Sequence, residues 1–298
     1  MKQVLTLARR NLRAYWRDPM SVFSSMVGPL IMFALFVVFL RKQMAEAMGA
    51  MVPGSTSADA YALCDSWMFA SITTMATFST SVGILSAFVE DRVSGRFSDY
   101  LVAPLRRWQL ALGYVVAVVA VSFIISIAIW ALGQLWTYLQ DQPLLTVDQG
   151  SRAIVGVFLS CLVFSAFNTV MVTFTATQGA YNGYALVMGT AMGFLSFCYV
   201  MPSTLSENLV SVLSLLPFAQ TAALVRRPSM QPGATQLFSF LPQGESRDQS
   251  LTDLMQAVGA ELTVQGHDLT TATMVMILLG LTVVLGVIAS WRMGRIIR

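Results

Sequence analysis

The sequence lacks the motifs through which a protein binds and hydrolyses ATP by itself. It contains no G-x-x-x-x-G-K-[ST] phosphate loop, and its two lysines, Lys2 and Lys42, could not supply one. An H-E-x-x-H helix, a G-x-S-x-G nucleophile elbow and paired intramembrane carboxylates are also absent. The chain is therefore not expected to be an ATPase, and it shows no chemistry for an intramembrane protease, esterase or acyltransferase.

Charge and cysteine are also scarce. Charged residues make up 11% of the 298 residues and hydrophobic residues 56%, with a mean hydropathy of +0.67. The three cysteines, Cys64, Cys161 and Cys198, match neither a disulfide framework nor a metal site, because they are odd in number and widely separated. No cofactor is expected in this chain itself. The composition is typical of an all-α polytopic membrane protein.

Long uncharged stretches predict six transmembrane helices. About 20 apolar residues are needed to cross the hydrocarbon of a bilayer as a helix. The stretch from 153 to 205 is long enough for two crossings, and the polar, glycine-rich segment from Gln178 to Gly183 divides it. The predicted spans cover about 20–40, 62–88, 108–138, 153–177, 183–202 and 270–291 of a single domain, residues 1–298.

The distribution of lysine and arginine predicts the orientation in the membrane. Residues 1–18 hold five of these cations, residues 89–107 four and the last eight residues three, so 12 of the 18 lie in these short segments. Such segments usually face the cytoplasm. Both termini are therefore predicted to be cytoplasmic, and the segment 203–269 extracellular. The net charge of +3 follows from this topology and indicates no nucleic-acid partner.

The first 18 residues predict an amphipathic helix on the membrane surface. Apolar residues recur at spacings of three and four: Leu5, Ala8, Leu12 and Tyr15. Arginines recur every four residues beside them: Arg9, Arg13 and Arg17, with Arg10 on the same side. An apolar stripe next to a cationic stripe suits the headgroup boundary. The helix could act as a simple anchor or have a mechanical role.

Four polar residues within the spans are candidates for a substrate path. Thr73 and Thr77 lie in the second predicted span, and Asn168 and Thr173 in the fourth. Helix packing is the alternative explanation, because threonine can bond back to its own helix, and an amide in hydrocarbon needs a partner. No Asp, Glu, Lys, Arg or His lies in the middle of a predicted span. This argues against an ion-coupled carrier.

A charged segment between the second and third spans, residues 90–104, predicts a short amphipathic helix. Its apolar residues recur every four positions: Val93, Phe97 and Leu101. Its other faces carry Glu90, Arg92 and Arg96, Gly95 permits a bend, and Pro104 ends the helix. Such a helix could insert into a groove of a soluble partner, or the segment could be an ordinary basic loop.

The segment after the fifth span is too apolar for a free loop. Its first part predicts an apolar helical face interrupted by Pro217, formed by Leu205, Leu209, Val212, Leu213 and Leu216. We expect this face to dip back into the outer membrane boundary. Residues 228–249 have a loop-like composition. A capping box at Ser250–Asp253 then predicts a short amphipathic helix.

Three short stretches resemble the permeases of ABC type-2 exporters. The first matches at Glu90, Arg92, Gly95, Tyr100-Leu101, Pro104-Leu105, Arg106-Arg107 and Gly113. The others are Arg10–Pro29, with its Arg-Asp-Pro and Gly-Pro, and Leu215–Arg227. The chain departs from the family in one place, because Phe197-Cys198 follows Phe-Leu-Ser where relatives commonly have glycine.

The resemblance implies a connecting helix at 1–18, a coupling helix at 90–104 and re-entrant outer helices. It also implies a second permease copy, identical or similar, and two cytoplasmic ATPase subunits that bind ATP and Mg. The expected function is export of a drug, lipid or other amphipathic substrate across a bacterial cell membrane. The expected ATPase-coupling residues are Glu90, Arg92, Val93, Gly95, Arg96, Phe97, Leu101 and Pro104. A secondary carrier or channel, an ABC importer permease and a non-transporting membrane sensor or scaffold are the alternatives.

Overall fold

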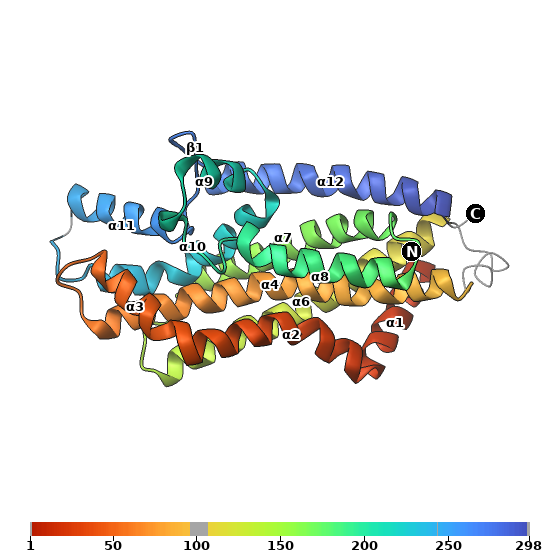
Figure 1. Cartoon of the computed structure of the whole chain (residues 1–298), viewed down its shortest axis with the longest axis horizontal. Coiled ribbons are helices and arrows are strands. Elements are labelled where there is room, and N and C mark those ends of the chain that lie inside the picture. The colour runs from red at the N-terminus through yellow and green to blue at the C-terminus, as the bar shows by residue number, and fades with distance from the viewer. Residues whose placement is uncertain (1, 96–106, 243, 297–298) are drawn as a thin grey trace.

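A computed structural model describes residues 2–95, 107–242 and 244–296. Within these residues the chain is almost entirely helical, and the only sheet is a two-stranded antiparallel pair, β1 (Thr263–Val264) and β2 (His267–Asp268). The long helices lie side by side along one axis (Figure 1). Both termini lie at one end, here called the terminal end, and α3 and α11 lie at the opposite, distal end (Figure 1).

Among the described residues, most helices follow one another with short connections. Their bounds are α1 Lys2–Arg17, α2 Pro19–Leu35, the π-helical turn η1 Phe36–Leu40, α3 Arg41–Ala50, α4 Ser57–Val93, α6 Arg107–Leu139, α7 Val147–Val172, α8 Gln178–Leu195, the 3-10 turn η2 Pro202–Thr204, α9 Glu207–Ser214, α10 Pro217–Leu237, α11 Glu245–Ala257 and α12 Thr271–Ile296.

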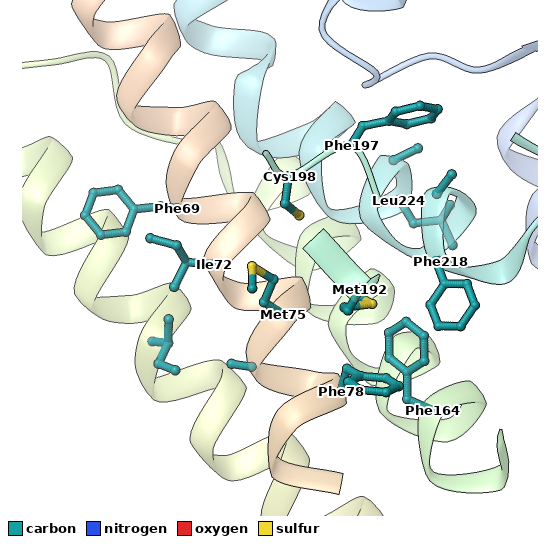
Figure 2. Packing of buried hydrophobic residues seen from close by; sticks show 14 of the residues in the cluster. Phe69, Ile72, Met75, Phe78, Phe164, Met192, Phe197, Cys198, Phe218 and Leu224 are labelled. Carbon is teal, nitrogen blue, oxygen red and sulfur yellow. The ribbon is translucent and has the colours of Figure 1, made fainter. Parts of the chain in front are cut away.

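The core is built around α4. This helix contacts α2, α6, α7, α8 and α10 and is buried along most of its length, whereas α12 is largely exposed. Figure 2 shows apolar side chains of α4 meeting those of neighbouring helices. The Phe78 ring lies 5.5 Å from the Phe164 ring of α7, which stacks at 5.7 Å on Phe218 of α10. Aromatic pairs of this kind add about 0.5–1.5 kcal/mol each beyond area burial.

Among the described residues, five helices are long and apolar enough to cross a membrane. They are Pro19–Ala50, Ser57–Val93, Leu112–Leu139, Val147–Val172 and Thr271–Met293. The pair α9 and α10, bent by 88°, raises the number to six if it counts as one broken span. α8, the predicted fifth span, does not pass because its first turns carry Gln178, Asn182 and glycines. The prediction of a multi-pass helical protein is confirmed, and the prediction of six spans stays open.

The first apolar helix continues past residue 40, where the sequence predicted a loop. α2 passes through η1 into α3 and ends at Ala50. Arg41 forms an ion pair with Asp65 of α4, and Ala45 and Met48 are buried. These contacts stabilise about three further helical turns that the polar composition of residues 41–50 did not indicate.

Residues 228–237 are helical, so the prediction of a loop for 228–249 is wrong for this part, whereas residues 238–242 are non-helical. α10 runs through Pro228 and Pro232 to Leu237 because α4 and α7 pack against it. Pro228 has no N–H, so the Leu224 carbonyl lacks its helical donor. A β-carbon on Gly156 of α7 would lie only 2.8 Å from that carbonyl oxygen. Glycine therefore allows α7 to approach α10 at the point where the proline interrupts its hydrogen bonds.

The ends of three further helices differ from the prediction, and side-chain caps explain the starts of two of them, α7 and α8. α7 begins at Val147 because Thr146 and Gln149 form a capping box, and it ends at Val172 where 177 was expected. Thr177 caps α8, so that helix covers Gln178–Leu195 where 183–202 was expected. α11 begins at Glu245, ahead of the predicted capping box at Ser250.

Candidate coupling and translocation sites

The terminal end contains a buried carboxylate that joins three helices. Asp91 of α4 is 4% exposed. It accepts hydrogen bonds from Arg10 of α1, with both terminal nitrogens at 3.3 Å, and from the Tyr114 hydroxyl of α6 at 2.5 Å. Gly113 allows α1 to approach α6, because a β-carbon there would lie 2.7 Å from Leu7. The Asp91 junction therefore ties the N-terminal helix to the end of α4.

α1 packs against α6 through a stripe that differs from the predicted one. Its buried residues are Val4, Leu7, Ala8, Asn11 and Tyr15. Leu5, expected in the apolar stripe, is 62% exposed, because the face that α6 covers is rotated from the one predicted. Arg9, Arg13 and Arg17 are exposed, as expected of the cationic face. The partner of Arg10 could not be recognised from sequence, because Asp91 lies 81 residues away.

A second contact fixes α1 to α2. The Tyr15 hydroxyl and Ser25 Oγ lie 2.6 Å apart. Burial raises the pKa of Tyr15, although the hydrogen bond to Ser25 opposes this shift. The phenol therefore stays protonated in the physiological range.

The connection between α7 and α8 is held from two sides. Arg92 at the end of α4 donates to the Thr175 carbonyl at 2.7 Å. Arg292 of α12 donates to Thr173 Oγ1 at 2.8 Å, and its guanidinium lies 3.8 Å from the centre of the Phe174 ring. The end of α4 and α12 are therefore both hydrogen-bonded to the connection that precedes α8.

The predicted coupling residues are only partly described. Glu90, Val93 and Gly95 are exposed at the end of α4, and Val93 is 58% exposed. Gly95 has φ of +74°, in the left-handed region that glycine adopts without strain, and it directly follows the helix end. Arg96, Phe97, Leu101 and Pro104 lie outside the described residues. The docking role of this segment stays a prediction.

The four predicted path residues lie between helices of the same chain. Thr73 and Thr77 are fully buried and bond back to the carbonyls of Phe69 and Thr74. Asn168 donates to Ser81 Oγ at 2.5 Å and accepts from the Tyr184 hydroxyl of α8. Thr173 is 4% exposed. Its hydroxyl donates a hydrogen bond to the Val170 carbonyl and accepts one from Arg292. Their assignment to a path stays a prediction.

A half-open groove lies between α2 and α8, with α4 as its floor. Its volume is about 470 Å³. The polar and small residues that line it include Ser24, Gly28, Ser79, Gly83, Ser86, Asn182, Gly189 and Thr190. Apolar residues also line it, including Ile31, Phe78, Val82 and Leu186. We call it the α2–α4–α8 groove. Ser86 lies within about two turns of the end of α4, and Asn182 within about two turns of the start of α8. Both of these helix ends are at the terminal end, so the groove lies in the half of the molecule nearer that end.

Two tyrosines, Tyr181 buried and Tyr184 partly buried, attach α8 to α4 and α7. The Tyr181 hydroxyl donates to the Val82 carbonyl, and Tyr184 donates to Asn168, which itself reaches Ser81. α8 is thus hydrogen-bonded to α4 and α7, and its surface also carries the exposed residues Leu186 and Val187.

A fully buried arginine, Arg226, joins α10 to α4 and to the turn after α8. Its guanidinium donates to Ser71 Oγ at 3.0 and 2.9 Å and to the Phe197 carbonyl at 2.8 Å, and it lies 5.3 Å from the Trp67 ring centre. Phe197 has φ of +56°, the region favoured by glycine, which is the residue expected there. No carboxylate pairs with Arg226 among the residues that the structure describes.

We expect Ser71→Ala to lower the free energy of unfolding by about 1–3 kcal/mol, because it removes a principal acceptor of a buried cation. Thermal unfolding of the purified protein measures this. Ser66→Ala is the matched control, since Ser66 on the same helix bonds only back to the Ala62 carbonyl. Equal effects of the two substitutions would contradict the role given to Ser71.

The chain is similar to one known protein family over most of its length. A family model described as ABC-2 type transporter matches residues 2–227. This region contains the Asp91 junction, the α2–α4–α8 groove and Arg226. No curated protein matches the chain.

Proposed function

The chain belongs to the ABC-2 type transporter family, and on that basis we propose that it is the permease of an ATP-driven exporter. Members of the family form the membrane part of ABC transporters and associate with ABC ATPase subunits that hydrolyse the nucleotide. We propose further that this chain pairs with a second permease copy in a bacterial cell membrane, with both termini in the cytoplasm. ATP and Mg bind to the partner ATPases.

The observation that carries this proposal is the linkage at the terminal end. The exposed end of α4 is adjacent to Asp91 and Arg92, which reach α1, α6 and the connection before α8. α4 is also the floor of the α2–α4–α8 groove. A push on the end of α4 is therefore expected to displace the helices around the groove. ATPase closure would supply that push through Glu90, Arg92, Val93 and the adjoining segment.

The groove suits a substrate with both polar and apolar parts. Serine, threonine and asparagine side chains alternate with apolar residues along its walls. Its position in the half nearer the terminal end suits entry from the cytoplasm or the inner leaflet. We therefore propose outward transport of a drug, lipid or other amphipathic compound.

Co-reconstitution with its ATPase tests this function. Transport into inside-out vesicles is expected to require ATP and to stop when the catalytic glutamate of the ATPase is replaced. Transport that continues without ATP would support a secondary carrier. Accumulation in the opposite direction would support an importer, and a chain that associates with no ATPase would support a sensor or scaffold.

We expect Gly189→Leu to reduce transport at least about tenfold, a change of about 1.4 kcal/mol. Gly189 lines the groove, and a β-carbon there meets nothing within 4 Å, so a larger side chain can start there without a backbone shift and occupy part of the groove. Gly286→Leu is the matched control, because Gly286 of α12 also has open space around it and lies outside the groove. Full transport by Gly189→Leu at normal expression would exclude the groove as the path.

A further inference from the structure

A second groove lies between α10 and α12, with α7 as its floor. It is half open and has a volume of about 660 Å³. It shares no residue with the predicted coupling segment, residues 90–104, or with the α2–α4–α8 groove. Its lining is divided by chemistry. The polar residues are Ser151, Arg152, Arg227, Gln231 and Thr271, and the main apolar residues are Val155, Leu159, Leu224 and Val275. We call it the α7–α10–α12 groove.

The polar residues lie at one boundary of the membrane. On α7, about 20 residues separate Arg152 from Thr173, and on α12 a similar number separates Thr271 from Arg292. Thr173 and Arg292 are hydrogen-bonded to each other at the terminal end. At 1.5 Å per residue, both separations are roughly 30 Å, the thickness of the hydrocarbon layer. Arg227 reaches the same level, because it donates to Thr271 Oγ1 at 2.7 Å.

The apolar residues extend from that boundary toward the middle of the membrane. Val155 and Leu159 lie about one and two turns beyond Arg152, and Val275 lies one turn beyond Thr271. The helix surfaces beside the groove are also apolar and exposed, at Ile154, Phe158, Met276 and Leu279. In a membrane protein, exposed surface of this kind faces acyl chains or another protein.

The two arginines retain donors for a further acceptor. Arg152 pairs with Asp148 at 2.9 Å, and Arg227 pairs with Glu261 at 3.0 Å and with Thr271. Neither carboxylate lines the groove. Because a guanidinium has five N–H donors, these contacts leave donors on each arginine, and the geometry suits the oxygens of a phosphate.

We propose that the α7–α10–α12 groove binds one glycerophospholipid of the leaflet at the distal end. Its phosphate accepts hydrogen bonds from Arg152 and Arg227, and one acyl chain lies along Val155, Leu159 and Val275. The order of the lining, cationic at the boundary and apolar below it, matches the order of a phospholipid.

Native mass spectrometry of the full chain in detergent, with added phosphatidylglycerol, tests the proposal without any ATPase. The wild-type chain is expected to retain one lipid more tightly than the double variant Arg152→Gln/Arg227→Gln, by at least about tenfold. Arg247→Gln is the matched control, because Arg247 lies on α11 at the distal end, outside the groove, and donates to the Thr235 carbonyl. It is expected to bind as wild type.

A phosphatidylglycerol with a photoreactive diazirine on its acyl chain locates the site. Labelling is expected on the α7 peptide that contains Val155 and Leu159, and it should decrease in the double variant. Equal lipid retention by all three proteins would overturn the proposal. Displacement of the bound lipid by millimolar inorganic phosphate would also overturn it, because it would indicate a simple anion site. An interchain disulfide formed by Val155→Cys, with no lipid bound, would show that a second copy covers the groove.

Discussion

Replacement of Asp65 by alanine is expected to lower the free energy of unfolding by about 3–5 kcal/mol, because it leaves a cation without its buried partner. Asp65 is fully buried and accepts a bidentate pair of hydrogen bonds from Arg41 at 2.8 and 2.7 Å. Trp136 and Gln142 donate to the same carboxylate at 3.1 and 2.8 Å. The Arg41 guanidinium also lies 4.9 Å from the Tyr61 ring centre. The substitution therefore removes the acceptor shared by three donor side chains.

The network lies at the distal end, about 25 residues along α4 from Glu90, which is roughly 37 Å at 1.5 Å per residue. This distance exceeds the hydrocarbon thickness of about 30 Å, so the ion pair is at the boundary and not in the membrane centre. It joins α3, α4, α6 and the loop after α6. Loss of Asp65 is expected to loosen all four together.

Thermal unfolding in detergent measures the Asp65 effect, and the double variant Arg41→Met/Asp65→Leu separates its causes. Replacing both charges with apolar side chains is expected to recover much of the lost stability, because a buried pair contributes little beyond its apolar substitute. Glu46→Ala is the control, since Glu46 forms only an exposed pair with Lys42. It is expected to change stability by no more than about 0.5 kcal/mol. A similarly small effect of Asp65→Ala would contradict the structural role of the network.

Val93→Asp is expected to weaken ATPase association or coupled transport at least about tenfold, or about 1.4 kcal/mol, because it places an unpaired charge in an apolar contact. Val93 is 58% exposed at the last turn of α4, two residues beyond the buried Asp91. Among the residues that the structure describes, none covers this apolar side chain fully. The proposed ATPase would provide that cover, and aspartate would place a charge in the contact.

Co-purification with the ATPase and permease-dependent stimulation of ATP hydrolysis measure the Val93 effect. Val147→Asp is the matched control, because Val147 is 92% exposed and begins α7 at the opposite end, where an acidic residue suits a helix N-terminus. It is expected to leave both readouts unchanged. Normal association and transport by Val93→Asp would place the docking surface elsewhere.

Local sequence patterns predicted which segments are helical better than they predicted the residues at which the helices begin and end. Apolar length identified α4, α6, α7 and α12, because a helix that crosses a membrane must satisfy its backbone internally and present apolar side chains. Helix ends depended on contacts across the fold. α3 extends to Ala50 through Arg41 and Asp65, and α10 passes two prolines because α4 and α7 enclose it.

The site residues also fall into two groups: those that a local sequence pattern identified, and those that come together only in the folded chain. The segment at 90–95 was recognised because its charge contrasts with its neighbours and its pattern resembles a family. Arg10, Asp91 and Tyr114 were missed as a group, because they are separated by 81 and 23 residues. Arg226 was placed in an outer segment, although it is fully buried 155 residues from Ser71. A single sequence gives no measure of which distant residues meet.

The sequence by itself determined that this protein is a largely helical, multi-pass membrane protein without an ATPase motif, and that its basic residues concentrate in three short segments of the chain. These properties depend on composition and on spacings of three and four residues, which are local. Only the tertiary structure decided which polar residues are partnered, where grooves open and which carboxylates join helices. Those outcomes depend on side chains from distant segments meeting at hydrogen-bonding distance, and packing alone sets that distance.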